Sequence, residues 1–140
     1  MKKFVRILSL TLVVVMLCAT LASCGAPAKD AADAVTALKE EGYVAVNDTT
    51  VTPLLFKAAG YELTSVVTGS KVVEDKDGNK STEIVVVYYF ADKDNAEKAL
   101  DKVKENAKEK QEESAENWVE PTRSGSMVYF GTKAAIKAAK

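Results

Sequence analysis

Glu62-Leu-Thr-Ser-Val-Val-Thr-Gly-Ser-Lys-Val-Val73 and Thr82-Glu-Ile-Val-Val-Val-Tyr-Tyr-Phe-Ala91, separated by a turn around Asp77-Gly78, decide the fold of this chain. Two β-rich runs on either side of an Asp-Gly pair predict an antiparallel hairpin. The second run is apolar on both faces: one face takes Ile84, Val86, Tyr88 and Phe90, and the other takes Val85, Val87 and Tyr89. A strand with two apolar faces is typical of a sheet centre covered on both sides.

Two helices and a short strand are predicted before the hairpin. From Asp30 or Lys29 to Glu41, apolar residues recur at helical spacing and Gly42 provides the stop, whereas residues 43–47 alternate weakly as a strand does. The next helix is expected to begin at Pro53, with Thr52 as its cap, and Gly60 follows its end. Its expected buried side consists of Leu54, Leu55, Phe56 and Ala59.

After the hairpin the apolar period becomes helical, from Asp94 to about Glu116, with Asp92 or Asp94 as the cap. The expected buried stripe contains Ala96, Ala99, Leu100, Val103 and Ala107. Residues 119–126 contain Pro121 and Gly125, which predict a loop. Residues 127–130 are predicted as the last strand, and an alanine-rich helix follows to Lys140.

From Tyr43 onward the predicted order is β-α-β-β-α-β, with one helix added at each end. This α+β order is the connectivity of the ferredoxin-like fold, which places the strands beginning at Tyr43 and Thr82 in the sheet centre. The two added helices are expected to cover the face that the inner pair leaves open. Similar strand-to-helix junctions after Tyr89-Phe90 and Tyr129-Phe130 further suggest neighbouring strands that point the same way.

The beginning of the chain carries a targeting pattern. Lys2, Lys3 and Arg6 precede an apolar run from Ile7 to Ala22, and Leu21-Ala-Ser-Cys24 follows directly. Residues 1–25 therefore resemble the signal peptide and lipobox of bacterial lipoprotein precursors. The apolar run is short for a membrane span, which needs about 20 apolar residues, although an uncleaved N-terminal anchor is the alternative interpretation.

The resemblance implies that residues 1–23 are a cleaved signal peptide and that Cys24 becomes the lipid-carrying first residue of the mature protein. Two or more acyl chains anchor a protein stably in a membrane. Residues 24–29 are then expected to be a short tether, and residues 30–140 a single domain. The expected location is the extracytoplasmic face of the cell membrane.

Composition limits the chemistry of this domain. The 140-residue chain has 19 Lys and Arg, 20 Asp and Glu, and no histidine. Losing Lys2, Lys3 and Arg6 leaves 16 basic residues and a formal charge of −4, which disfavours nucleic-acid binding. The lack of histidine removes the commonest general base and metal ligand. Cys18 leaves with the signal, so lipidation of Cys24 leaves no free thiol. We expect neither catalysis, nor a cofactor, nor a metal.

The best sequence candidates for recognition are Trp118 and Arg123, because these residue types are enriched at interaction hot spots. The alternative for Trp118 is that it plugs the end of the long helix against the sheet. Acidic runs in residues 74–77 and 109–116 do not show the set spacing of catalytic carboxylates, and a charged surface accounts for both.

The leading hypothesis is a lipid-anchored, non-enzymatic module that binds an envelope protein partner. One alternative is a small-ligand-binding or sensory lipoprotein, which requires a cavity lined by Tyr or Trp between the sheet and the terminal helices. A hydrolase that uses carboxylates alone is the other alternative.

Overall fold

The predicted hairpin forms the middle of a five-stranded antiparallel sheet in the computed structural model, which describes residues 25–111 and 117–140. Strand β2 (Leu63–Glu74) pairs with β3 (Lys80–Phe90) from Leu63 opposite Phe90 to Glu74 opposite Lys80. Gly78 has φ +83° in the turn, a value that glycine tolerates without strain. The prediction of the hairpin is confirmed.

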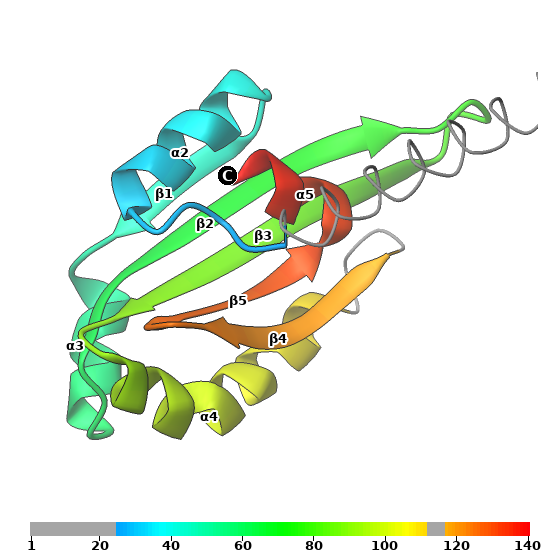
Figure 1. Ribbon diagram of the computed structural model, residues 1–140. Helices are drawn as coiled ribbons and strands as arrows, with labels where there is room; N and C mark the ends of the chain where they lie inside the picture. Colours follow the sequence, from blue (N-terminus) through cyan, green and yellow to red (C-terminus); the bar gives the residue numbers. More distant parts are fainter. Residues whose placement is uncertain (1–24, 112–116) are drawn as a thin grey trace, which may run out of the picture.

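The strand order is β1-β2-β3-β5-β4, and each neighbouring pair is antiparallel. Strand β1 spans Val44–Asp48, β4 spans Trp118–Ser124 and β5 spans Met127–Thr132. The sheet is therefore a pair of consecutive segments, β1-β2-β3 and β4-β5, joined where β5 lies against β3 (Figure 1).

The ferredoxin-like order is wrong, although the α+β class is confirmed. Strand β1 lies at an edge of the sheet, whereas the ferredoxin-like order requires it in the centre. The physical reason is the connection through α3, which returns the chain beside β1 as β2, so that β2 and not β1 pairs with β3. Strand β1 consequently has one covered face, with Ala45 buried and Val44 and Val46 exposed. The two similar strand-to-helix junctions belong to β3 and β5, which are neighbours but run in opposite directions.

The prediction of a loop over residues 119–126 is also wrong, because most of this segment is strand β4. Pro121 and Gly125 are tolerated because β4 is an edge strand and Gly125 lies in the tight turn to β5. The register shifts between Val119 and Thr122, on either side of the proline.

Helices cover both faces of the sheet. Helices α2 (Ala31–Glu40) and α5 (Lys133–Ala138) pack on one face, and α3 (Val51–Ala58) and α4 (Lys93–Gln111) pack on the other (Figure 1). The prediction that the terminal helices share one face is confirmed. On β3, Val85, Val87 and Tyr89 face α2 and α5, and the alternate residues face α3 and α4, which confirms the predicted central strand.

Side-chain caps fix the starts of two helices. The Asp30 carboxylate accepts a hydrogen bond from Ala32 N at 2.8 Å, and the Asp92 carboxylate accepts one from Asn95 N at 2.8 Å. The predicted continuation of the long helix to Glu116 falls on residues 112–116, which lie outside the described residues.

Candidate interaction surface

Among residues 25–111 and 117–140, six large hydrophobic side chains are strongly exposed, and all six belong to β1, β2 and α3. Their exposed fractions range from 59% to 71%. The residues are Val44 and Val46 on β1, Val72 on β2, and Val51, Leu54 and Leu55 on α3. We call this set the β1/α3 surface. Single exposed hydrophobic residues are ordinary, but a group on adjacent elements marks a site of interaction.

The three valines lie on the same side of the sheet as α3. Side chains alternate along a strand, and Ala45 packs with the α2/α5 cluster, so Val44 and Val46 point to the opposite face. Val72 has the same parity as Val66, which packs with the α3/α4 cluster. Helix α4 contacts β3, β4 and β5, and it leaves the outer part of this face, over β1 and the distal part of β2, to solvent.

Helix α3 exposes its more apolar side. Phe56 is its buried residue, and its ring packs against Tyr88 at a centroid distance of 5.5 Å. Val51, Leu54 and Leu55 have the i, i+3, i+4 spacing of one helical stripe, and all three point to solvent. The prediction that Leu54, Leu55 and Ala59 are buried is therefore wrong, whereas Phe56 is buried as predicted. The sequence shows that this stripe of α3 is apolar, but it does not show that no other described element packs against the stripe.

Asp48 holds α3 rigidly at the end of β1. Its carboxylate accepts hydrogen bonds from the backbone N–H groups of Thr50 at 2.8 Å, Val51 at 3.0 Å and Thr52 at 2.8 Å, and from the Thr52 hydroxyl at 2.7 Å. These bonds hold the pKa of the Asp48 carboxyl well below its usual range. The helix thus begins at Val51 with Thr50 at the N-cap position, and the Asp48 carboxylate, not Thr52 as predicted, accepts hydrogen bonds from its first N–H groups.

The two edges of the sheet differ in how they resist pairing with another chain. Strand β4 carries Pro121, Arg123 and a register shift, three features that protect an edge. Strand β1, with the sequence Val-Ala-Val-Asn-Asp, has no proline, no lysine and a regular register with β2. Within the described residues its outer edge has no strand partner. The open edge therefore coincides with the β1/α3 surface.

A polar contact braces β1 across the sheet. The Tyr43 hydroxyl, just before β1, donates a hydrogen bond to the Glu83 carboxylate on β3. Lys71 on the intervening strand places its Nζ 5.4 Å from the Tyr43 ring centroid and donates to the Glu41 carbonyl at 3.0 Å. Burial and the Glu83 carboxylate raise the pKa of Tyr43 strongly. The edge strand is therefore fixed to the sheet centre.

The sequence candidates Trp118 and Arg123 lie at opposite ends of β4. Trp118 is half-buried, pairs with Thr132 and packs against the Phe130 ring at 5.6 Å between centroids. Its buried indole N–H has no acceptor within the described part of the chain. Arg123 is half-buried, pairs with Val128 and donates to the Gly125 carbonyl at 3.2 Å. The fold does not bring the two side chains together.

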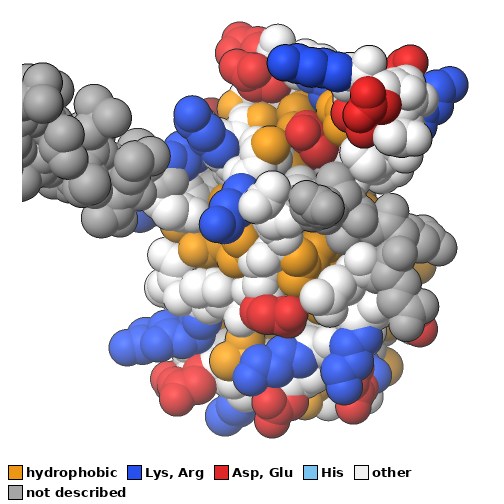
Figure 2. All heavy atoms as spheres, turned by 90° about the vertical axis from the view of Figure 1, so that its right-hand side faces the viewer, with side chains coloured by type: hydrophobic (Ala, Val, Ile, Leu, Met, Phe, Trp, Pro, Cys, Tyr) orange, Lys and Arg blue, Asp and Glu red, His pale blue; other side chains and the backbone are white. Residues whose placement is uncertain are grey.

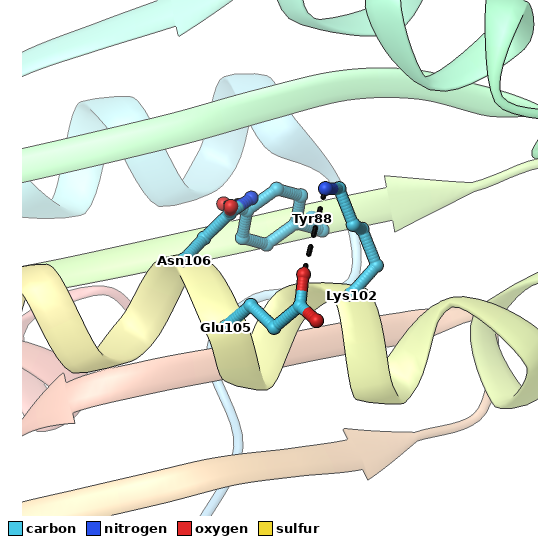
Figure 3. A network of polar contacts seen from close by, with 4 residues as sticks. All are labelled: Tyr88, Lys102, Glu105 and Asn106. Atoms are coloured by element: carbon cyan, nitrogen blue, oxygen red, sulfur yellow. Dashed lines mark hydrogen bonds and ion pairs between the residues drawn. The ribbon is translucent and has the colours of Figure 1, made fainter.

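Tyr88 illustrates how the tyrosines serve packing. It lies on β3 beneath α4, and Asn106 of that helix reaches its hydroxyl at 3.5 Å (Figure 3). On the exposed side of α4, Lys102 forms an ion pair with Glu105 at 3.5 Å (Figure 3). Burial raises the pKa of Tyr88, and the Asn106 contact opposes that shift.

The segment that precedes α2 packs on the sheet. Pro27 is buried, Ala28 N donates to the Ala139 carbonyl at 2.9 Å, and the Tyr89 hydroxyl donates to the Ala28 carbonyl at 2.7 Å. Residues 26–28 therefore belong to the packed fold, on its α2/α5 face. Cys24 and the signal-like residues 1–23 lie outside the described residues.

A cavity with a volume of about 600 Å³ lies between the turn end of the β2–β3 hairpin and the start of α5. Its polar lining includes Asp75, Glu83, Thr132 and Lys133. Two of these groups are engaged elsewhere: Asp75 accepts from Asp77 N at 2.8 Å and Asn79 N at 2.9 Å in the turn, and Glu83 accepts from Tyr43. The lining contains neither Tyr nor Trp, and the space between the sheet and the terminal helices is filled by side chains.

The described residues offer neither a metal centre nor a membrane-crossing helix. Among residues 25–111 and 117–140, no cluster of three His, Cys, Asp or Glu side chains has a geometry that would hold a metal ion. No helix of these same residues combines the length and the hydropathy that crossing a membrane requires.

Comparison with family models, curated proteins and solved structures finds no match for this chain. The assignment of the β1/α3 surface therefore rests on its own geometry.

Proposed function

We propose that this chain is a lipid-anchored, non-enzymatic domain on the extracytoplasmic face of the cell membrane, which binds a protein partner through the β1/α3 surface. One observation supports the binding part: in the part of the chain that the structure describes, six exposed large hydrophobic residues lie on β1, β2 and α3, on the side of the sheet that α3 covers and beside an edge without a strand partner. The anchoring part is supported by the lipobox-like stretch that ends at Cys24.

An extended segment of a partner suits this surface best. A strand added to β1 would satisfy the backbone groups of the open edge, as in other complexes formed by β-strand addition. Its side chains on the α3 side would cover Val44 and Val46, and the leucines of α3 would cover the partner from that side. Because Asp48 and Tyr43 fix β1 and α3, the surface is ordered before binding and little ordering entropy is lost.

The ligand-binding alternative has weaker support. The cavity near the start of α5 lacks the aromatic lining that this alternative requires, and two of its acidic groups already have partners.

A photocrosslinking experiment in cells tests the binding surface. A photoreactive amino acid replaces Val46 on the open edge or, as the matched control, Thr122 on the protected edge β4. We expect an adduct of one defined mass from position 46 and none from position 122. The adduct from position 46 should disappear when Leu54→Glu and Leu55→Glu are added, with the domain still folded by circular dichroism. Equal crosslinking from both positions, or none from either, would contradict the proposal.

Labelled palmitate tests the anchor independently. The wild-type chain should incorporate the label and Cys24→Ala should not. Equally low incorporation by both would show that the lipoprotein interpretation is wrong.

A further inference from the structure

Four exposed lysines lie on the α2/α5 side of the fold, where the described chain begins. Lys133 and Lys137 lie one turn apart on α5, so at 100° per residue they are about 40° apart around the helix axis, and Lys140 follows the C-cap residue Ala139. All three are exposed, whereas Ala135, Ile136 and Ala139 pack on the sheet. The exposed Lys29 follows Ala28, whose N–H donates to the Ala139 carbonyl, and it lies toward the Phe90 end of the sheet, whereas Lys133 lies toward the hairpin turn.

Among the described residues, the ammonium groups of these four lysines have no ion-pair or hydrogen-bond partner. Helix α5 has no acidic residue. Nearby, the Asp30 carboxylate caps α2, and Glu83, which shares the cavity with Lys133, accepts the hydrogen bond from Tyr43. In Figure 2 a group of basic side chains lies on the left of the upper half, and further basic side chains alternate with acidic ones along the top and the bottom.

The position of these lysines relative to the start of the described chain indicates which anion they meet. The described chain begins at Gly25 beside α5 (Figure 1), and residues 26–28 pack on the sheet instead of forming a free tether. Cys24 is one residue away, and one residue spans at most about 3.6 Å. A lipid on Cys24 therefore brings the four lysines to the level of the phospholipid headgroups.

We propose that Lys29, Lys133, Lys137 and Lys140 form a membrane-contacting face that binds anionic phospholipid headgroups and orients the anchored domain. This inference rests on the proposed lipid anchor. The mature chain has a formal charge of −4, so the remainder of the molecule carries −8 and is repelled by the same surface. Attraction at one face and repulsion elsewhere give the domain a preferred orientation. The β1/α3 surface, on the opposite side of the sheet, then faces away from the bilayer.

A vesicle flotation experiment tests this face without the natural lipid. The chain from Cys24 onward, which contains every described residue, is prepared with its thiol blocked by N-ethylmaleimide. It is floated with vesicles of phosphatidylcholine alone or with one third phosphatidylglycerol. Each lysine near an anionic surface contributes about a fivefold gain in binding constant. We expect binding to the anionic vesicles only, and its loss when the Debye length falls to about 4 Å in high salt.

A charge-matched pair of variants separates the face from net charge. Changing the four lysines to glutamine should weaken binding to the anionic vesicles by about a hundredfold or more. The control changes four exposed lysines of α4, Lys93, Lys98, Lys108 and Lys110, to glutamine and should bind at least tenfold more tightly than the first variant.

Three results would overturn the proposal: equal weakening by both variants, binding without dependence on phosphatidylglycerol, or displacement by millimolar inorganic phosphate, which would indicate a phosphate site. Because the blocked thiol replaces the natural lipid, absence of palmitate labelling in cells would refute the anchor and leave this measurement unaffected.

Discussion

Replacing Gly69 with alanine should force α2 away from the sheet. Gly69 lies on β2 opposite Ala45 and Val85, directly beneath Leu38 of α2. A Cβ atom at Gly69 would stand 2.8 Å from Leu38 Cδ1, 3.0 Å from Leu38 Cδ2 and 3.3 Å from Val85 Cγ1. Contacts this short in a packed core cost about 1–3 kcal/mol of unfolding free energy. The lower half of that range applies here, because the clashing atoms are the tip of a side chain.

A double-mutant cycle measures this contact. Leu38 is fully buried, so Leu38→Ala alone should cost about 2–5 kcal/mol through the cavity that it leaves. In the double variant the alanine methyl at position 69 occupies part of that cavity and no longer meets the leucine. The double variant should therefore be more stable than the sum of the single changes predicts, by about 1–2 kcal/mol.

Urea denaturation followed by circular dichroism gives the four unfolding free energies. The matched control pairs Gly69→Ala with Val103→Ala, a fully buried residue in the cluster on the other face, and these two changes should add within about 0.5 kcal/mol. Additivity of the Gly69 and Leu38 changes would refute the close contact between α2 and β2.

Three further outcomes are expected. Gly131→Ala should prevent folding, because φ at Gly131 is +144° and a Cβ atom there would lie 2.1 Å from a backbone oxygen of β3; soluble yield and circular dichroism measure this. Gly125→Ala is the control: φ is +61° but the space around it is open, so the change should lower the unfolding free energy by only about 1–2 kcal/mol. Asp48→Ala should lower the melting temperature at pH 7, because it removes the carboxylate that caps α3. Folding lowers the pKa of Asp48, so the stability that Asp48 contributes is present above about pH 4, and the difference between wild type and variant should disappear on acidification. Burial raises the pKa of Tyr43 and Tyr89 in the folded state, so stability should be retained below about pH 10 and fall above it, where the unfolded tyrosines ionise; an unchanged melting temperature at pH 11 would contradict this.

The parts of the fold that sequence predicts well are those in which local pattern and burial agree. The hairpin, the two-sided strand β3 and the stripe Ala96, Ala99, Val103 of α4 all follow from the spacing of apolar residues. In each of these elements the apolar residues recur with a clear period and the element has a clear end, so the local preference agrees with the tertiary structure.

The remaining features depend on neighbours that local sequence does not encode. Strand β4 contains Pro121 and polar residues, and it is a strand because β5 lies beside it. Strand β1 lies at the edge because the chain turns back through α3 and forms β2 directly beside β1. The composition of β1 does not determine this position.

Candidate site residues were the hardest to predict. Reasoning from residue type selected Trp118, which proves to pack on Phe130. The exposed leucines of α3 were expected in the core, since sequence shows that a stripe is apolar but not whether another element covers it. The lysines of α5 do not stand out in the sequence, because the net charge of the whole chain does not reveal a local excess of positive charge.

The strand order also bears on how the chain folds. Three of the four strand pairings, β1 with β2, β2 with β3 and β4 with β5, connect strands that are consecutive along the chain. Such local pairings close short loops and are formed quickly, whereas the β3–β5 pairing has to enclose α4 and β4. We therefore expect two independently nucleated ribbons to form first and to join late along a single seam, where five residue pairs from Val85 opposite Gly131 to Tyr89 opposite Met127 complete the sheet.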